Sequence, residues 1–283
     1  MVSSDRYVAP EPIINIDILK ASFPAYYNLL NQDELQPYKI ILCSNLSGKK
    51  EEAAETIILL YNSEFIMLKN VTNGISKHKL LLEDVNFLVN EGVPHSYCIV
   101  IDYKHAQNER IYYDSKVNDL VRGILTEFRI KLLESMRIDE RSACSELAFS
   151  DMELNKYPGA AIAKSLILDE NSVLCSLMQR KVHNHPGLLF SKVVTNTHFT
   201  VVCKREIIIF MERSSTRVSR DISGDLIHIP LRALRNISIE ATGKGMLLKY
   251  LFNSNRKLEL FYENQSTEQL LKIMSYVNSL IAL

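Results

Sequence analysis

The sequence predicts an α+β protein that is mostly β, in which a curled seven-strand barrel closed by a C-terminal amphipathic helix occurs twice. Three observations predict this fold class. One pattern of apolar positions recurs along the chain, the apolar runs are short and bounded by turn residues, and each copy ends in a helical stripe. Curling a sheet with a helix across one open end buries its apolar face and protects its edges.

The recurrence has a fixed period over its clearest part. "KLLLEDVNFLV" (79–89) and "HIPLRALRNIS" (228–238) lie 149 residues apart and match in their apolar positions. The same offset aligns "YCIVIDY" with "MLLKYLF" and "RIYYDS" with "ELFYEN". Upstream, "YNSEFIMLKN" matches "CKREIIIFME" after a shift that places Glu64 opposite Glu206. One structural unit is therefore expected twice, in the same order.

The strands of the second copy are read from runs rich in Val, Ile, Leu, Phe and Tyr between clusters of turn residues. They are expected at 173–182, 197–203, 206–212, 226–230, 235–241, 246–252 and 257–262. The closing helix opens on "NQSTEQ", where Ser266 and Gln269 have the spacing of a capping box. Its apolar stripe runs from Leu270 to Ile281, and the first copy closes in the same way from Val117 to Leu132.

The run "FTVVCKREIIIF", followed by "IPLRALRNISIE", two further strands and a last helix, resembles the bacterial pleckstrin-homology-like (PH-like) domains. The resemblance covers 169–283 well and 33–136 more loosely. It implies PH-like domains at 33–136 and 169–283. The segment 137–168 between them begins with a polar run of mixed charge and is expected to be a connector, and 1–32, which contains Pro10 and Pro12, is expected to be an N-terminal arm and lead-in. Eukaryotic PH domains usually carry a tryptophan in the last helix, and this chain has none. That difference weakens any transfer of lipid binding.

Composition indicates a folded, soluble protein. The 283 residues are 47% hydrophobic, which is enough to bury real cores. No apolar run is long enough to span a membrane, and the first residues lack the plan of a signal peptide, so a cytoplasmic location is expected. The five cysteines are scattered without a C-x-x-C motif, and we expect them to be reduced core residues.

The stretch "RKVHNHPGLLF" (180–190) is open to three interpretations: a metal site, an anion site or a hairpin turn. Pro186 and Gly187 are ordinary turn residues. Two histidines on a loop, without a nearby third ligand, are a poor start for a metal site, and no metal or other cofactor is predicted. The anion reading rests on the resemblance, because PH domains gather three loops at the open end of the barrel, where they hold phosphorylated headgroups.

All three corresponding loops of the second copy carry cations, which suit phosphate oxygens. The candidate anion-site residues are Arg180, Lys181, His183, His185, Arg213, Arg217, Arg220, Arg256 and Lys257. The alternative is that polar loops simply gather Lys and Arg for solubility. In the first copy the equivalent "SGKKEEAAE" loop balances its lysines with glutamates, so any anion site belongs to the second copy.

No arrangement of residues in the sequence meets the requirements of an enzyme active site. "ATGKGMLL" lacks the glycine spacing of a phosphate loop and is expected to be a hairpin connection. His228 lies in an alternating strand, where a sheet histidine is expected. The carboxylate pairs have no partnered nucleophile or base, so we expect no catalysis.

Charge is distributed unevenly although the net charge is zero. Residues 169–283 carry 15 Lys+Arg against 10 Asp+Glu, or plus five, and residues 1–136 carry 14 against 18, or minus four. Opposite charges favour docking of the halves within a chain or between chains. We therefore expect a non-enzymatic scaffold that binds a protein partner or itself, with strand addition by an extended peptide such as the proline-bearing leader as one mode. The runner-up is peripheral binding of an anionic membrane or a phosphorylated ligand; nucleic acid or histone binding is not favoured.

Overall fold

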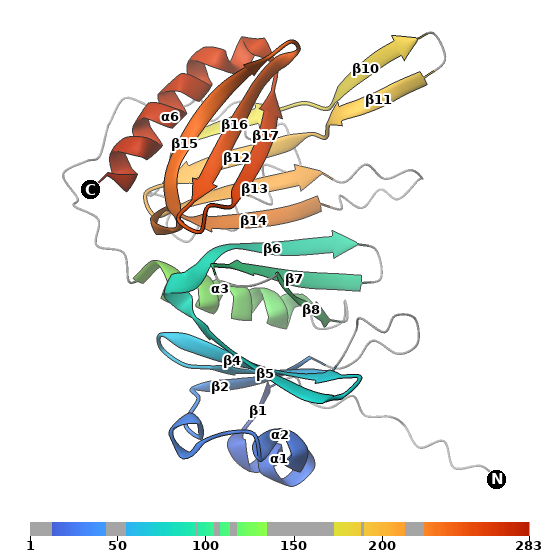
Figure 1. Ribbon diagram of the computed structural model, residues 1–283, viewed down its shortest axis with the longest axis vertical. Helices are drawn as coiled ribbons and strands as arrows, with labels where there is room; N and C mark the ends of the chain where they lie inside the picture. The colour runs from blue at the N-terminus through green and yellow to red at the C-terminus, as the bar shows by residue number, and fades with distance from the viewer. Residues whose placement is uncertain are drawn as a thin grey trace. The chain divides into compact units, whose positions relative to one another are not determined.

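A computed structural model describes residues 13–43, 55–93, 96–104, 108–113, 118–134, 173–187, 190–212 and 224–282. The chain is mostly β, with antiparallel sheets and a C-terminal helix, as predicted (Figure 1). Its contacts divide it into unit 1, comprising 1–82 and 111–121, and unit 2, comprising 83–110 and 122–283. These units differ from the predicted domains because three strands of the first copy lie in one sheet with strands of the second copy. The domain boundaries themselves stay a prediction.

Unit 1 contains a five-stranded antiparallel sheet. Its strands follow one another in the order β1 (Ile13–Ile14), β2 (Lys39–Cys43), β3 (Thr56–Leu60), β4 (Glu64–Val71) and β5 (Gly74–Leu81). The runs "KIILC" and "TIILL" are almost wholly buried, as expected for central strands with both faces covered. The β4–β5 hairpin turns at Gly74, whose φ of 130° a residue with a Cβ rarely adopts.

The lead-in to unit 1 is partly helical from Ile13 onward. It forms β1, α1 (Ile16–Ser22), α2 (Pro24–Tyr27) and a short 3₁₀ turn, η1 (Gln32–Glu34). Asn15 caps α1, its side chain accepting a hydrogen bond of 2.9 Å from the Ile18 amide. Leu19 and Tyr26 are buried with the sheet residues, so this segment contributes to the core of unit 1. The prolines at positions 10 and 12 lie outside the described residues.

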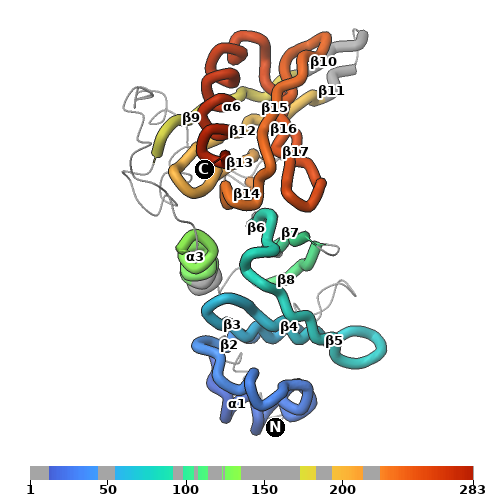
Figure 2. Tube along the Cα trace, turned by 60° about the vertical axis from the view of Figure 1, so that its left-hand side comes forward, coloured from blue at the N-terminus to red at the C-terminus, as the bar shows by residue number. Residues whose placement is uncertain are grey.

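Unit 2 is built around a larger antiparallel sheet. In spatial order the sheet runs β8 (Glu109–Tyr113), β7 (Ser96–Tyr103), β6 (Val85–Val93), β14 (Gly224–Pro230), β13 (Glu206–Glu212), β12 (His198–Cys203) and β9 (Val173–Gln179). A second sheet contains β15 (Leu234–Thr242), β16 (Gly245–Phe252) and β17 (Lys257–Tyr262). The helix α6 (Thr267–Ile281) lies alongside β15 in both views (Figures 1 and 2). Leu270, Ile273 and Val277 of α6 join one core with residues of both sheets.

The predicted internal repeat is visible in the order and bounds of the elements. Each copy contains β-hairpin strands, a 3₁₀ turn, three strands and a helix. An offset of 149 residues carries η2 (Leu82–Asp84) onto η6 (Leu231–Ala233), β6 onto β15 and β7 onto β16 without any change of bounds. It also brings the start of α3 (Asn118–Glu134) onto the start of α6. Sequence spacing therefore located the equivalent elements correctly.

Two expectations about the second copy are wrong in detail. The first strand ends at Gln179, and "VHNHPG" is not a loop but strand β10 (Val182–Gly187), which pairs with β11 (Phe190–Thr195). The backbone register, with bulges, includes His183 opposite Val193. Ser266 is the N-cap of α6, but its side chain makes no capping hydrogen bond. The 3₁₀ turn η7 (Asn264–Ser266) leads directly into the helix, so Ser266 is also the last residue of that turn.

The described strands do not close into a hydrogen-bonded barrel. The expected seven strands of the second copy are shared between the large sheet and the β15–β17 sheet, and the large sheet continues into β6, β7 and β8 of the first copy. This arrangement arises because η6 breaks the chain between β14 and β15, which leaves one edge of β14 open for a strand from elsewhere in the chain. β6 pairs with this open edge of β14, and the candidate site lies at that pairing.

Candidate functional site

The candidate site is the pairing of β6 with β14, which we call the sheet junction. Its antiparallel register places Leu88 opposite His228, Val89 opposite Ile227, and Glu91 opposite Asp225. β6 belongs to the first copy and β14 to the second. The two copies therefore associate by strand addition, a mode in which backbone hydrogen bonds supply affinity and side chains supply register.

A buried group of charged and polar side chains lies at this junction; we call it the junction cluster. Arg129 on α3 donates to Glu206 on β13 through Nη2 at 2.5 Å and through Nε at 3.3 Å. His228 on β14 places Nδ1 at 3.5 Å from the Glu206 carboxylate. The side chains of all three residues are at most 5% exposed. A two-point contact of a guanidinium with a carboxylate fixes both position and orientation.

The cluster holds unusual protonation states. Burial, aided by the positive charge of Arg129, lowers the pKa of His228 to about 4, although Glu206 acts in the opposite direction. Burial alone would raise the pKa of the Glu206 carboxyl, but the hydrogen bond with His228 and the charge of Arg129 together lower it. His228 is therefore neutral and Glu206 charged at neutral pH, so the cluster contains one balanced ion pair.

A second ion pair also connects the two copies, but here the arginine belongs to the second copy and the carboxylate to the first. Arg256, before β17 in the second copy, contacts the carboxylate of Asp102 on β7 and donates to Asn108 Oδ1 at 2.7 Å. The Asp102 side chain is only 2% exposed, and its other oxygen accepts 2.8 Å from Asn86 Nδ2. Each copy thus supplies an arginine to a buried carboxylate of the other. Phe87 of β6 and Phe252 of β16 also pack together across the two copies, with ring centroids 5.3 Å apart.

The structure separates two of the described cations of the predicted anion site, Arg180 and Arg256. Arg180 is exposed and follows Gln179, whose side chain bonds to Glu263 at the end of β17. Arg256 precedes the same strand, and six extended residues separate the two positions by roughly 20 Å. Arg256 is also committed to Asp102.

The remaining predicted anion-site residues fall into three groups. Lys181 is exposed beside Arg180, and Lys257 pairs with Glu259 at 2.9 Å. His183 and His185 lie on β10, and their side chains are outside the described structure. Arg213, Arg217 and Arg220 lie outside the described residues.

A polar group inside the core of the second copy is a further candidate. Thr200 and Tyr262 share a hydrogen bond of 2.8 Å between their hydroxyls, and the His198 ring packs edge-on against Tyr262 at 4.8 Å. Burial lowers the pKa of His198 to about 4, partly opposed by a contact of 3.1 Å with the Asn196 carbonyl. Because His198 and Thr200 lie on β12 and Tyr262 lies on β17, these contacts connect the two sheets of unit 2.

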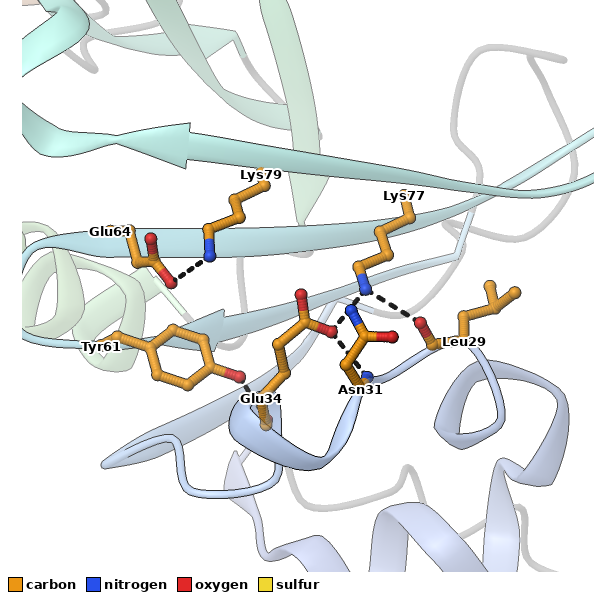
Figure 3. A network of polar contacts seen from close by, with 7 residues as sticks. All are labelled: Leu29, Asn31, Glu34, Tyr61, Glu64, Lys77 and Lys79. Carbon is orange, nitrogen blue, oxygen red and sulfur yellow. Dashed lines mark hydrogen bonds and ion pairs between the residues drawn. The ribbon is translucent and has the colours of Figure 1, made fainter.

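Unit 1 has its own polar network, which attaches the lead-in to β5 (Figure 3). Lys77 of β5 donates to the Leu29 carbonyl at 2.9 Å and contacts the carboxylate of Glu34, which also accepts 2.8 Å from the Asn31 amide. Burial alone would raise the pKa of the Glu34 carboxyl, but the hydrogen bond and the positive charge of Lys77 outweigh this effect, so the pKa is lowered. The network is structural in character, because each group binds a group of the same unit.

The hairpin β10–β11 extends beyond the strands that precede and follow it (Figure 1). Val193 and Val194 on β11 are 37% and 36% exposed. Because neighbouring residues of a strand point to opposite faces, the hairpin presents an aliphatic side chain on both faces.

Sequence reasoning missed the junction residues Arg129, Glu206 and Asp102. The match of Glu64 with Glu206 in the repeat was a usable signal, because a carboxylate retained at the start of an apolar strand in both copies needs a partner. The partner itself could not be inferred, since Arg129 lies 77 residues away from Glu206 along the chain. The four cysteines in the described residues are free and buried, as predicted for them.

Comparisons of the sequence with protein-family models and with the curated proteins find no match. Among the described residues no group of three or more His, Cys, Asp or Glu side chains is placed to hold a metal ion. Within the same residues, none of the helices combines the length and apolar character that a membrane span requires.

Proposed function

We propose that this chain is a non-enzymatic scaffold that binds a protein partner through two PH-like domains. Each domain would be a curled arrangement of seven strands closed by a helix, at 33–136 and 169–283. The observation that carries the proposal is the sheet junction, in which β6 is added to the edge of β14 with Leu88 opposite His228. A fold that already binds one strand in this way has the chemistry to bind another.

The surface we assign to the partner is the β10–β11 hairpin, together with β9, the last strand of the large sheet among the described residues. The exposed Val193 and Val194 supply apolar area, and the exposed cations Arg180 and Lys181 lie next to it in the chain. An apolar centre with a charged rim is the usual composition of a protein interface. Two cations at a rim chiefly influence association rate and orientation.

The anionic-membrane alternative has less support. It requires the cations of the second copy to gather at one rim, whereas Arg180 and Arg256 lie at opposite ends of β17. Arg256 also neutralises Asp102. A protein partner needs no such gathering of charge, and we therefore prefer it.

The test is residue-resolved crosslinking in the source cells, with the full chain carrying a photo-crosslinker at position 193. We expect a discrete crosslinked protein that is lost when Val194→Asp is added. Val71→Asp, on a similarly exposed valine of unit 1, is the matched control and should leave the crosslink intact. Loss of the product in both variants, or no product with the unmodified sequence, would overturn the proposal. Co-sedimentation with anionic vesicles at low and high salt tests the alternative.

A further inference from the structure

Asn278 on α6 occupies the open edge of β15. The Ile237 amide donates to Asn278 Oδ1 at 2.8 Å, and Asn278 Nδ2 donates to the Ile237 carbonyl at 2.9 Å. Ile237 lies opposite Tyr250 in the β15–β16 register, yet both of its backbone groups bind α6. They therefore point away from β16, toward the side where a further strand would pair. A carboxamide carries one acceptor and two donors, so it can replace the backbone of a neighbouring strand residue.

The internal repeat supplies the comparison. The residue 149 positions before Ile237 is Leu88 on β6, and Leu88 lies opposite a true strand residue, His228 of β14. The residue 149 positions before Asn278 is Arg129, which binds Glu206 instead of the edge of its own sheet. The two copies thus differ at one helix position. Where that residue is arginine the edge has received a strand, and where it is asparagine the helix occupies the edge.

The complementary edge is β5 in unit 1. In the repeat β5 corresponds to β14, because Ile66 opposite Lys79 repeats the register of Ile208 opposite His228. β5 is the last strand of its five-stranded sheet in the part of the chain that the structure describes. Glu64 takes the place of Glu206 and pairs at 2.8 Å with Lys79, which takes the place of His228. A lysine on an edge strand disfavours the approach of another strand.

We propose that Asn278 is an edge cap, and that β15 is a latent docking edge for β5 of a second copy of this chain. The edges β15 and β5 are the outer equivalents of β6 and β14, so their pairing would repeat the sheet junction between molecules. Such contacts are heterologous, and each added molecule would offer the same free edge again. Asn278 and Lys79 therefore limit the sheet junction to one per chain. This inference does not depend on the proposed partner or on the β10–β11 hairpin.

The direct test rebuilds the internal junction at the outer edges. In Asn278→Arg/Lys79→His both equivalent positions take the residues found at the sheet junction. We expect sedimentation velocity to show a series of species whose weight-average mass at least doubles as the protein concentration rises. The unmodified chain should not show this concentration-dependent series. Adding Glu64→Gln removes the carboxylate that the new guanidinium would bind, and should reverse the assembly. A double variant that is folded by circular dichroism but stays monomeric would overturn the proposal, as would assembly that Glu64→Gln leaves unchanged.

A second measurement tests the cap without new assembly. In Asn278→Ala the Ile237 amide loses its acceptor, and its hydrogen exchange should become about tenfold faster, the factor expected for one hydrogen bond. Ser279→Ala, at the next and exposed position of α6, is the matched control and should leave this exchange rate unchanged. Equal exchange at Ile237 in the unmodified and Asn278→Ala chains would show that the edge is not capped.

Discussion

Arg129 on α3 binds both carboxylate oxygens of Glu206, with nitrogen–oxygen distances of 2.5 and 3.3 Å, although the two residues lie 77 positions apart in the chain. Both side chains are at most 5% exposed. A buried ion pair contributes little net stability, because desolvation offsets attraction, but it strongly penalises any arrangement that leaves one partner alone. The Arg129–Glu206 pair therefore specifies the register of the sheet junction more than it adds to the stability of that junction.

Replacing Arg129 alone should destabilise the protein severely. Arg129→Met leaves the Glu206 carboxylate buried without its cation, and we expect a loss of about 3–5 kcal/mol in the free energy of unfolding. Urea unfolding followed by circular dichroism measures it. The double variant Arg129→Met/Glu206→Leu should recover most of this loss, because it removes both charges. A double variant as unstable as the single one would contradict the ion-pair explanation.

Mild acid should destabilise the protein through its two buried histidines. His228 and His198 each have a folded-state pKa of about 4, below the unfolded value near 6.5. Because the unfolded chain binds more protons between these values, stability is full above about pH 6.5 and falls as pH decreases toward 4, by up to about 3 kcal/mol per histidine. Glu206, whose pKa is also lowered, adds a loss at still lower pH.

Urea midpoints measured between about pH 7 and pH 4 would show this dependence. His228→Gln should have a shallower decline than the unmodified chain, since one of the two titrating groups is gone. A midpoint that does not change across this range would show that the two histidines titrate normally in the folded protein.

Arg256 should matter for stability more than Arg180. Arg256→Ala removes the cation from the buried Asp102 carboxylate, whose second oxygen keeps the hydrogen bond from Asn86. We expect the free energy of unfolding to fall by about 1–3 kcal/mol. This is less than for a fully buried pair, because the Arg256 side chain is 35% exposed. Arg180→Ala, at an exposed position, should change stability by less than about 0.5 kcal/mol. Thermal unfolding of both variants provides the comparison. Equal effects would show that the Arg256–Asp102 pair does not stabilise the junction.

Gly245 should not tolerate a side chain, whereas Gly243 should. A Cβ at Gly245 would collide with the Tyr262 carbonyl oxygen and approach the Phe261 ring to 2.6 Å, while a Cβ at Gly243 meets nothing within 4 Å. We expect Gly245→Ala to lower the free energy of unfolding by about 2 kcal/mol or more, because β16 and β17 must separate. Gly243→Ala, two residues away in the same hairpin, should have little effect. Chemical denaturation distinguishes them, and similar stabilities would place β17 farther from β16.

Much of the fold could be predicted because local chemistry specifies it. The apolar runs, the turn residues and the 149-residue repeat located β6, β7, β15, β16 and both closing helices. The β10–β11 hairpin was missed because Pro186 and Gly187 resemble a turn in isolation, and only pairing with Phe190–Thr195 makes the segment a strand. The candidate anion residues were grouped by loop, but loop membership alone did not specify that Arg180 and Arg256 would lie near opposite ends of β17.

The sequence by itself determined that one strand-and-helix pattern occurs twice, because side-chain periodicity and turn chemistry act over a few residues and are written in the local order. Only the tertiary structure decided how the copies associate, because the partners are far apart in the chain. Leu88 meets His228, Arg129 meets Glu206, and Asp102 meets Arg256 across more than seventy residues in every case. Such contacts depend on which edge and which buried charge remain unsatisfied after local folding, and no local pattern contains that information.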